Sequence, residues 1–293
     1  MGNGQSLPFG RQVSNLTQVF LGNTHLNTND SILFMIELNY KEFGQGEPII
    51  ILHGLFGTLD NWQTIAKQLS ENHLVYILDL RNHGKSPHTE GVMSYHIMAE
   101  DVALFMQQNW MHSATIIGHS MGGKVAMQMA MDYPDLVEKL IVIDIAPKKY
   151  KGGHEEIFDA LLNLDLTKLT DRKVAESYLM DKLKNDTGTV QFLLKNLSRR
   201  TDTEGGGFEW KMNLSVLNRD YQILMDTFEV TETFEKDTLF IRGGNSNYIR
   251  DEDFETIKTI FPKATLETVE GAGHWVHAEK PKELLDKLLK FLN

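Results

Sequence analysis

Residues 114–131 read ATIIGHSMGGKVAMQMAM: an apolar β-rich run, a serine between glycines, and a run of good helix formers. The pattern G-x-S-x-G between a strand and a helix is typical of a nucleophile elbow, in which the serine lies on a tight, strained turn. Side chains two positions before and after Ser120 would clash in such a turn, which explains Gly118 and Gly122. This stretch predicts an α/β fold with Ser120 as a nucleophile.

Short apolar runs alternate with segments of helical periodicity on both sides of this stretch. We expect strands at residues 36–41, 48–52, 74–79, 114–118, 140–144, 238–242 and 264–269. We expect helices at residues 61–69, 95–107, 121–131, 250–260 and 281–292. Near-continuous apolar runs such as Ile49–Leu52 are typical of strands covered on both faces. The alternation predicts a mostly parallel sheet flanked by helices.

Residues 147–235 interrupt this alternation. Four helical patterns follow one another there without buried strands between them, at 155–164, 171–183, 190–197 and 220–228. We therefore predict a helical cap at 147–235, inserted into a core formed by residues 35–146 and 236–293. The Gly205–Gly207 run marks a flexible turn inside the cap.

Residues 1–34 form a separate compositional segment with one Arg, one Asp and no Lys among many Asn, Thr, Gln and Ser residues. They lack the basic start and apolar centre of a secretory signal, and a mitochondrial transit peptide would carry more Arg residues. We expect an N-terminal extension that is poorly ordered, or a stretch upstream of the natural start, with Met35 as that start.

The composition of the 293-residue chain excludes several function classes. Lys and Arg number 29 against 40 Asp and Glu, so the formal net charge is −11, which disfavours nucleic acid and anionic membrane surfaces as partners. Cysteine does not occur, which excludes disulfides, thiolate metal sites and a cysteine nucleophile, and fits a reducing compartment. No apolar run reaches the roughly 18 residues of a membrane span. We expect a cytoplasmic protein without a membrane span.

A serine hydroxyl is a weak nucleophile and needs a neighbouring base. The Gly-rich phrase Gly271–Trp275 follows the last predicted strand and contains His274, which puts His274 at the same sheet edge as Ser120. His119 lies within the elbow, where its side chain would point away from Ser120, and His277 lies at the start of a helix. His274 is therefore the predicted base.

A developing oxyanion needs two backbone N–H groups beside the nucleophile. The phrase His53–Gly57 has the pattern H-G-x-x-G and follows the strand at 48–52. A loop of this pattern can offer the amide of Leu55 alongside that of Met121. We predict these two amides as the oxyanion hole.

The phrases around these residues resemble the α/β-hydrolase family, and within it the bacterial YbfF-type esterases. They lie at residues 53–61, 79–86, 118–124, 144–147, 243–246 and 271–281, and so cover all but the N-terminal extension. The resemblance implies an α/β-hydrolase fold with a helical cap and a carboxylic ester hydrolase without a cofactor. It implies a small-molecule acyl ester or thioester as the substrate, and we expect no metal.

The acid member departs from the wider family. Most relatives carry it in a Gly-x-x-Asp phrase after the penultimate strand, where this chain has Ser246. The resemblance implies Asp144, at the end of an earlier strand, with Ser246 as an auxiliary group that also touches the histidine. Asp144 could instead only cap a turn. Asp251 and Asp253 are weaker alternatives because they begin a helix, where acidic residues serve as caps.

Two basic residues near these motifs have structural explanations. We expect Arg81 to tie down the loop at 79–86, with recognition of a substrate carboxylate as the alternative. We expect Lys124 to be solvated or salt-bridged and not catalytic.

The predicted reaction is ester hydrolysis through an acyl-serine intermediate. Ser120 attacks the carbonyl carbon, His274 transfers the proton, and Asp144 orients and stabilises the imidazolium. Two alternatives stay open. A carbon–carbon bond hydrolase or a perhydrolase would use the same triad, and a non-catalytic protein of this fold could enclose a ligand beneath its cap.

Overall fold

The apolar runs around the Gly-flanked serine assemble into one seven-stranded sheet, with strands in the order β1-β3-β2-β4-β5-β8-β9. The computed structural model describes residues 36–200 and 207–293, so the predicted extension at 1–34 lies outside the described residues. The strands are β1 (Tyr40–Phe43), β2 (Pro48–Leu52), β3 (Leu74–Leu78), β4 (Ala114–His119), β5 (Val137–Ile143), β8 (Thr238–Gly243) and β9 (Ala264–Val269). β1 is antiparallel to β3 and every other pair in the sheet is parallel, which confirms the predicted mostly parallel sheet.

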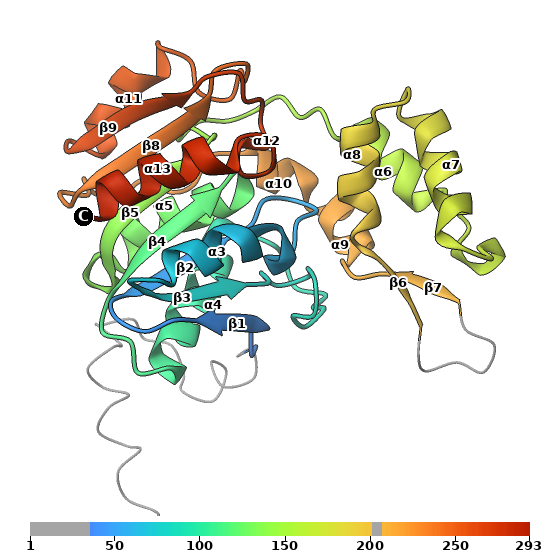
Figure 1. Ribbon diagram of the computed structural model, residues 1–293, viewed down its shortest axis with the longest axis horizontal. Helices are drawn as coiled ribbons and strands as arrows, with labels where there is room; N and C mark the ends of the chain where they lie inside the picture. Colours follow the sequence, from blue (N-terminus) through green and yellow to red (C-terminus); the bar gives the residue numbers. More distant parts are fainter. Residues whose placement is uncertain (1–35, 201–206) are drawn as a thin grey trace, which may run out of the picture. The chain divides into compact units, whose positions relative to one another are not determined.

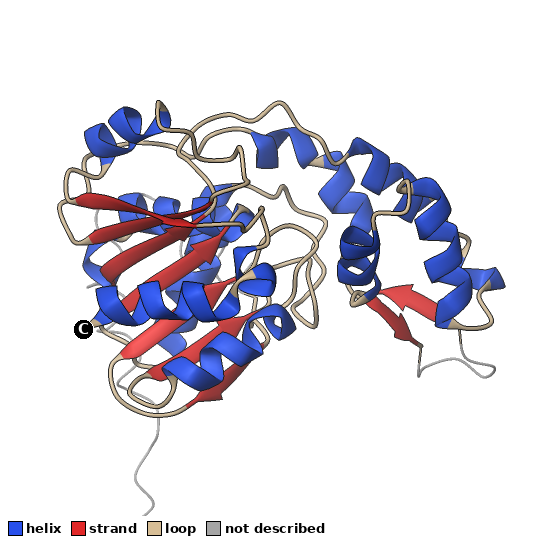
Figure 2. Ribbon diagram, turned by 45° about the horizontal axis from the view of Figure 1, so that its top comes forward, coloured by secondary structure: helices blue, strands red, loops and turns tan. Residues whose placement is uncertain are grey.

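Helices cover both faces of this sheet (Figure 2). Side chains of β2 alternate between two hydrophobic clusters, with Ile50 and Leu52 in one and Ile49 and Ile51 in the other. Side chains of α4 (Tyr95–Gln108), α5 (Met121–Asp132) and α11 (Asp253–Ile260) are among those that join the first cluster. Side chains of three more α-helices join the second cluster: α3 (Gln63–Leu69), α12 (Val276–Glu279) and α13 (Pro281–Leu292). Burial on both faces explains why the strands are continuous apolar runs.

The first strand begins later than the sequence predicts, at Tyr40 and not at residue 36. The N–H of Asn39 donates to Ser86 Oγ at 2.9 Å, and the Asn39 side chain donates to Asp79 Oδ2 at 2.7 Å. These side-chain hydrogen bonds hold the chain before Tyr40, so the ladder with β3 starts only there.

Residues 147–235 between β5 and β8, here called the inserted segment, contain a group of short helices and a hairpin. Its elements are α6 (Glu155–Leu162), α7 (Arg172–Lys182), α8 (Thr187–Leu194), β6 (Leu197–Arg199), β7 (Phe208–Trp210), α9 (Leu214–Arg219) and α10 (Tyr221–Met225). Figure 1 shows α6, α7 and α8 beside one another, away from the seven-stranded sheet. The sequence does not predict the antiparallel β6–β7 hairpin, because strands of three residues are too short to show an alternating pattern. Gly205 and Gly206 lie outside the described residues.

Buried hydrogen bonds connect the inserted segment to loops at the edge of the sheet. The side chain of Asn196 donates to the carbonyl oxygen of Phe56 at 2.6 Å. The backbone N–H of Asn213 donates to the carbonyl oxygen of Asn82 at 2.9 Å. The segment is therefore fixed to the same edge at which Ser120 lies.

Single-turn 3₁₀ helices complete the fold at Leu59–Trp62, Pro134–Leu136 and Leu166–Lys168. In the parts of the chain that the structure describes, no helix combines the length and the apolar character of a membrane span.

Buried histidines make the stability of this fold depend on pH. His53 and His83 are at most 1% exposed, and burial lowers their pKa values to about 4 and about 3. The unfolded pKa is about 6.5, so between pH 6.5 and about 4 the unfolded state binds protons that the folded state does not. We expect the free energy of unfolding to fall as pH drops through this window, by roughly 2 kcal/mol for each histidine at pH 5. Urea titrations at pH 7.5 and pH 5 measure this change.

A variant of one of these histidines measures how much that residue contributes to the pH dependence of the unfolding free energy. His83→Asn should reduce the difference in unfolding free energy between the two pH values, because the titrating ring is gone while an amide can still donate to the carbonyl oxygen of Arg81. His112→Asn, at an exposed position, should leave the difference unchanged. An unaltered pH dependence in His83→Asn would contradict the linkage.

Candidate active site

Ser120 lies on the turn between β4 and α5 in a strained backbone conformation. Its φ of 53° and ψ of −120° are uncommon for a residue with a side chain. A Cβ atom at Gly118 would lie 2.2 Å from the carbonyl oxygen of Gly122, and one at Gly122 would lie 2.5 Å from that of Leu52. Contacts this short leave room only for glycine at both positions, so the turn presents Ser120 beside β2.

Ser120, His274 and Asp144 form a continuous hydrogen-bonded chain. His274 Nε2 lies 3.0 Å from Ser120 Oγ, and His274 Nδ1 lies 2.7 Å from Asp144 Oδ2. Ser120 follows β4, Asp144 follows β5 and His274 lies in the loop after β9, so the parallel sheet brings all three to one edge. A carboxylate on Nδ1 favours the tautomer in which Nε2 is free to accept the serine proton.

Two groups from β8 and its following loop hold the Asp144 carboxylate, which is fully buried. The N–H of Gly243 donates to Oδ1 at 3.0 Å, and the Ser246 hydroxyl donates to Oδ2 at 2.5 Å. Ser246 thus binds the carboxylate oxygen that His274 also contacts, and among the described residues no hydrogen bond joins Ser246 to the ring of His274. β8 is the neighbour of β5 in the sheet, so the loop after β8 begins beside Asp144.

Ser246→Ala should reduce kcat/KM by about tenfold, since it removes one hydrogen bond to the Asp144 carboxylate, about 1.5 kcal/mol. The N–H of Gly243 and the ring of His274 would still contact the Asp144 carboxylate. Steady-state kinetics on a chromogenic ester provide the measurement. A loss of a hundredfold or more would place the Ser246 hydroxyl in the proton-transfer chain itself.

Two backbone amides beside Ser120 are available for an oxyanion. The N–H groups of Leu55 and Met121 donate to no acceptor among residues 36–200 and 207–293. Gly54 brings the first of them close to the nucleophile, because a Cβ atom there would lie 3.2 Å from that of Ser120. The arrangement fits the role predicted for both amides.

His53 holds the loop that carries Leu55. One ring nitrogen, Nδ1, lies 2.8 Å from the carbonyl oxygen of Gly54, and the other, Nε2, accepts the N–H of Leu80 at 3.0 Å. Both ring nitrogens are therefore used inside the protein, and burial keeps the ring neutral with a pKa of about 4. His53 positions the loop and is not a second base.

His119 and His277 lie near His274 but are poor bases. His119 Nε2 lies 2.8 Å from the carbonyl oxygen of His274, while His277 stacks on Trp62 with ring centroids 4.7 Å apart. Burial lowers the pKa of His277 to about 3 and that of His119 well below 6.5. Neither ring takes up a proton readily at neutral pH, which leaves His274 as the base that Ser120 contacts.

Tyr248 contacts the base, and the sequence does not predict this contact. Its ring stacks on that of His274 with centroids 3.8 Å apart and an interplanar angle of 16°. The N–H of Tyr248 also donates to Ser246 Oγ at 3.2 Å. The one sequence signal is its position two residues beyond Ser246. Tyr248 limits the orientations that the imidazole can adopt.

Arg81 and the two weaker acid candidates have partners outside the triad. Arg81 is buried and its Nε and Nη2 atoms each lie 2.5 Å from an oxygen of Asp101, as its structural role predicts. Asp251 pairs with Arg242, and Asp253 accepts the N–H of Arg250 before α11.

Lys124 differs from its prediction as a solvated or salt-bridged side chain. It is only 1% exposed, and its Nζ donates to the backbone carbonyl oxygen of Asp226 at 2.5 Å. The Nζ also lies 4.9 Å from the centroid of the Tyr150 ring. Burial lowers the pKa of Lys124 to about 7. The predicted exposure or salt bridge of Lys124 is wrong because the chain after α10 covers the side of α5 that carries Lys124. That contact joins distant parts of the sequence.

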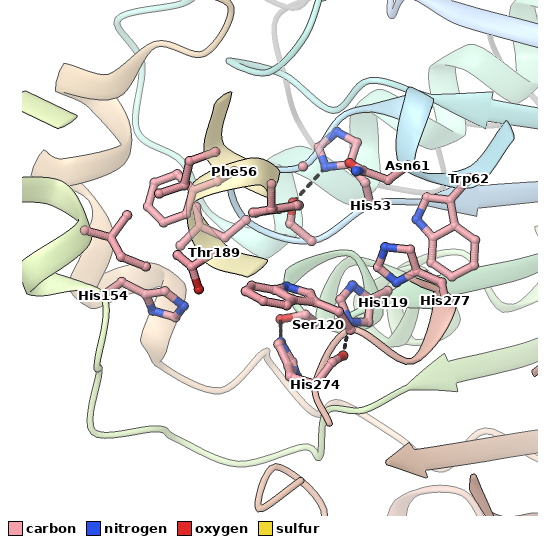
Figure 3. A pocket seen from close by; sticks show the side chains of 17 residues that line it. His53, Phe56, Asn61, Trp62, His119, Ser120, His154, Thr189, His274 and His277 are labelled. Carbon is pink, nitrogen blue, oxygen red and sulfur yellow. Dashed lines mark hydrogen bonds between the residues drawn. The ribbon is translucent and has the colours of Figure 1, made fainter. Parts of the chain in front are cut away.

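Ser120 lies where two pockets meet. The first, shown in Figure 3, has mostly apolar and aromatic walls that include Phe56, Trp62, Ile157, Phe192, Leu193 and Trp275. The second lies beside α5 and α10 and is lined by Tyr95, Lys124, Ile145, Tyr150, Leu224 and Tyr248, among others. A substrate bound at Ser120 can therefore place one arm in each pocket.

Comparisons with known proteins show which family the chain belongs to. The chain is 38% identical over 247 residues to esterase YbfF of Escherichia coli, covering 84% of this chain and 93% of that protein. It is 37% identical over 290 residues to the sn-1-specific diacylglycerol lipase ABHD11 of Xenopus laevis, covering 95% and 91%. A solved structure of a marine microorganism esterase matches with a TM-score of 0.84 and 42% identity, covering 87% of this chain and 99% of that one. Residues 47–281 match the family described as alpha/beta hydrolase fold. The chain therefore belongs to the α/β-hydrolase fold family.

Proposed function

We propose that the protein is a serine esterase that hydrolyses small, short-chain carboxylic esters or thioesters through an acyl-serine intermediate. The observation that carries this proposal is the hydrogen-bonded chain from Ser120 through His274 to the buried Asp144. Two amides beside Ser120, unpaired among the residues that the structure describes, add the second requirement of acyl transfer. Relatives that are named as esterases and lipases support chemistry of the esterase type.

In the acylation half of the proposed reaction, Ser120 Oγ attacks the ester carbonyl carbon while its proton moves to His274 Nε2. The carbonyl oxygen becomes an oxyanion that the amides of Leu55 and Met121 bind. Collapse of this intermediate breaks the bond to the alcohol or thiol, which leaves with the proton from His274. The buried charge of Asp144 stabilises the imidazolium between these two proton transfers.

In the deacylation half, a water molecule takes the place of the alcohol. His274 Nε2 accepts a proton from this water as it attacks the acyl-serine carbonyl carbon. The second tetrahedral intermediate then expels Ser120 Oγ, which regains its proton from His274, and a carboxylic acid is released.

The second pocket supports a short acyl chain. Its lining includes two side chains whose polar atoms are bound to the backbone: the Tyr95 hydroxyl donates to the carbonyl oxygen of Leu224, and Lys124 Nζ to that of Asp226. These hydrogen bonds fix the wall that a longer chain would have to displace.

A rate panel over acyl-chain length tests the proposal. We expect 4-nitrophenyl esters to give an initial burst of 4-nitrophenol equal to the enzyme concentration wherever deacylation is the slower step. We expect kcat/KM to be highest for short acyl chains, and thioesters of the same acids measure the preference for the leaving group. Turnover of no ester or thioester would contradict the proposal and favour a carbon–carbon bond hydrolase, a perhydrolase or a ligand-binding protein.

A further inference from the structure

His154 is the residue of the inserted segment that lines both pockets at Ser120. Three residues line both pockets: Leu55, Ser120 and His154. Leu55 offers an oxyanion amide and Ser120 the nucleophile, so the scissile carbonyl group lies where the two pockets meet. In Figure 3 the His154 ring lies across the pocket from Trp62 and His277 and faces Ser120 and His274.

A buried hydroxyl determines which nitrogen of the His154 ring carries hydrogen. The hydroxyl of Tyr221 accepts the backbone N–H of His154 at 3.0 Å and lies 2.8 Å from His154 Nδ1. Tyr221 is only 4% exposed, so its own proton needs an acceptor within the protein. Nδ1 is that acceptor, which leaves the hydrogen of the neutral imidazole on Nε2.

The ring stays neutral, and its second nitrogen is free. Burial lowers the pKa of His154 to about 4, with a smaller contribution from the neighbouring His274. His154 therefore cannot act as a base at neutral pH. Within the described ranges, Nε2 has no hydrogen-bond partner. The site thus contains an unpaired N–H donor beside the scissile group.

The backbone and two aromatic rings hold His154 in this position. Gly152 and Gly153 have φ values of 97° and 132°, which only glycine adopts readily, and they lead the chain into α6. The imidazole then packs edge-on against Phe56 and Tyr221, with centroids 5.9 Å and 5.6 Å away. The Nε2 donor is therefore preorganised before a substrate binds.

Three other polar groups of the second pocket are already paired. The Tyr150 hydroxyl donates to the carbonyl oxygen of Tyr248 at 2.7 Å, and the Tyr95 hydroxyl and Lys124 Nζ also bind carbonyl oxygens. An apolar ester at the junction would displace the water that hydrates His154 Nε2–H and would offer no acceptor in its place. The donor would then be buried without a hydrogen bond, which makes binding of such an ester less favourable. A substrate with an oxygen at this place would avoid the penalty.

We infer that His154 makes the site selective for esters that carry a second hydrogen-bond acceptor, an ether or carbonyl oxygen close to the scissile ester group. The acceptor belongs to either the acyl or the alcohol part of the substrate, because His154 lines both pockets. This inference rests on the proposed esterase function. It makes His154 a specificity-determining residue that donates to substrate and takes no part in proton transfer.

Two pairs of isosteric substrates test the inference. 4-Nitrophenyl methoxyacetate and 4-nitrophenyl butyrate differ by one ether oxygen in the acyl part. 2-Ethoxyethyl butyrate and pentyl butyrate differ in the same way in the alcohol part. The measured quantity is the ratio of kcat/KM for the oxygen-containing ester to that for its isostere, and the change in this ratio between variants cancels the intrinsic reactivity of each ester.

We expect His154→Leu to lower this ratio about tenfold in at least one pair, because leucine cannot donate a hydrogen bond to the additional oxygen of the substrate. His154→Gln should retain most of the ratio, because its amide can still donate. Tyr221→Phe should lower it partly, because the tautomer is no longer fixed. His112→Leu, the same substitution at an exposed histidine, should leave it unchanged.

The outcomes separate this inference from the proposed function. An equal ratio in wild type and His154→Leu for both pairs would overturn the inference, whether or not the variant is slower with every ester. If wild type turns over none of the four esters, the proposed esterase function fails and the inference fails with it. Melting temperatures of the variants show whether each remains folded.

Discussion

Ser120→Ala should lower turnover of every ester by about a millionfold and leave the fold intact, because the loss of a triad nucleophile typically has that effect. The hydroxyl is the group that His274 Nε2 contacts at 3.0 Å, and no other serine shares this contact among the residues that the structure describes. The substitution removes one partly buried oxygen from a turn whose shape depends on Gly118 and Gly122. We therefore expect the melting temperature to change little.

Covalent labelling provides the most direct measurement. A fluorophosphonate should add one mass equivalent to the wild type and none to Ser120→Ala. Ser215→Ala, which removes an exposed serine hydroxyl of α9, serves as the matched control and should label like the wild type. A label on another serine, or full activity in Ser120→Ala, would overturn the assignment of the nucleophile.

Asp144→Asn should lower kcat by roughly three to four orders of magnitude, as loss of a triad aspartate does elsewhere. The hydrogen bonds at Asp144 give the reason. The N–H of Gly243 donates to Oδ1, so the oxygen of an asparagine amide would take that position and its NH₂ group would face His274 Nδ1. An amide donor there stabilises the tautomer with hydrogen on Nε2, which cannot accept the proton of Ser120.

The control for this variant is Asp251→Asn. Asp251 is the alternative acid, and its exposed carboxylate pairs with Arg242, so we expect kcat to stay within about twofold of wild type. Nitrogen NMR of the His274 ring should show the proton on Nδ1 in wild type and on Nε2 in Asp144→Asn. If Asp251→Asn is the more damaging substitution in folded protein, Asp144 is not the acid.

Local patterns predict the sheet and the placement of the candidate triad because both depend on short stretches of chain. The apolar run at 264–269 coincides with β9, and Pro281 begins α13 as its fixed φ favours. Each triad residue directly follows a strand or lies in the loop after one. A parallel sheet brings such positions to one edge whatever the rest of the chain does.

Contacts between distant segments account for what the sequence does not predict. The burial of Lys124 depends on the carbonyl oxygen of Asp226, about a hundred residues further on. His154 becomes a donor in the site only because the Tyr221 hydroxyl donates to its Nδ1, and Tyr248 meets His274 only after β8 and β9 pair. No periodicity within a window of a dozen residues contains these pairs.

The inserted segment leaves the sheet after β5 and returns to it at β8, and these two strands are hydrogen-bonded neighbours. A replacement of different length can therefore join the same two strands, and the entropy of closing a longer connection grows only slowly with its length. Ser120, Asp144 and His274 all lie outside this segment, whereas His154 lies within it. Transplanting the segment between relatives would thus exchange substrate preference while the reactive groups stay where they are, a route by which evolution or an engineer can diversify one catalytic core.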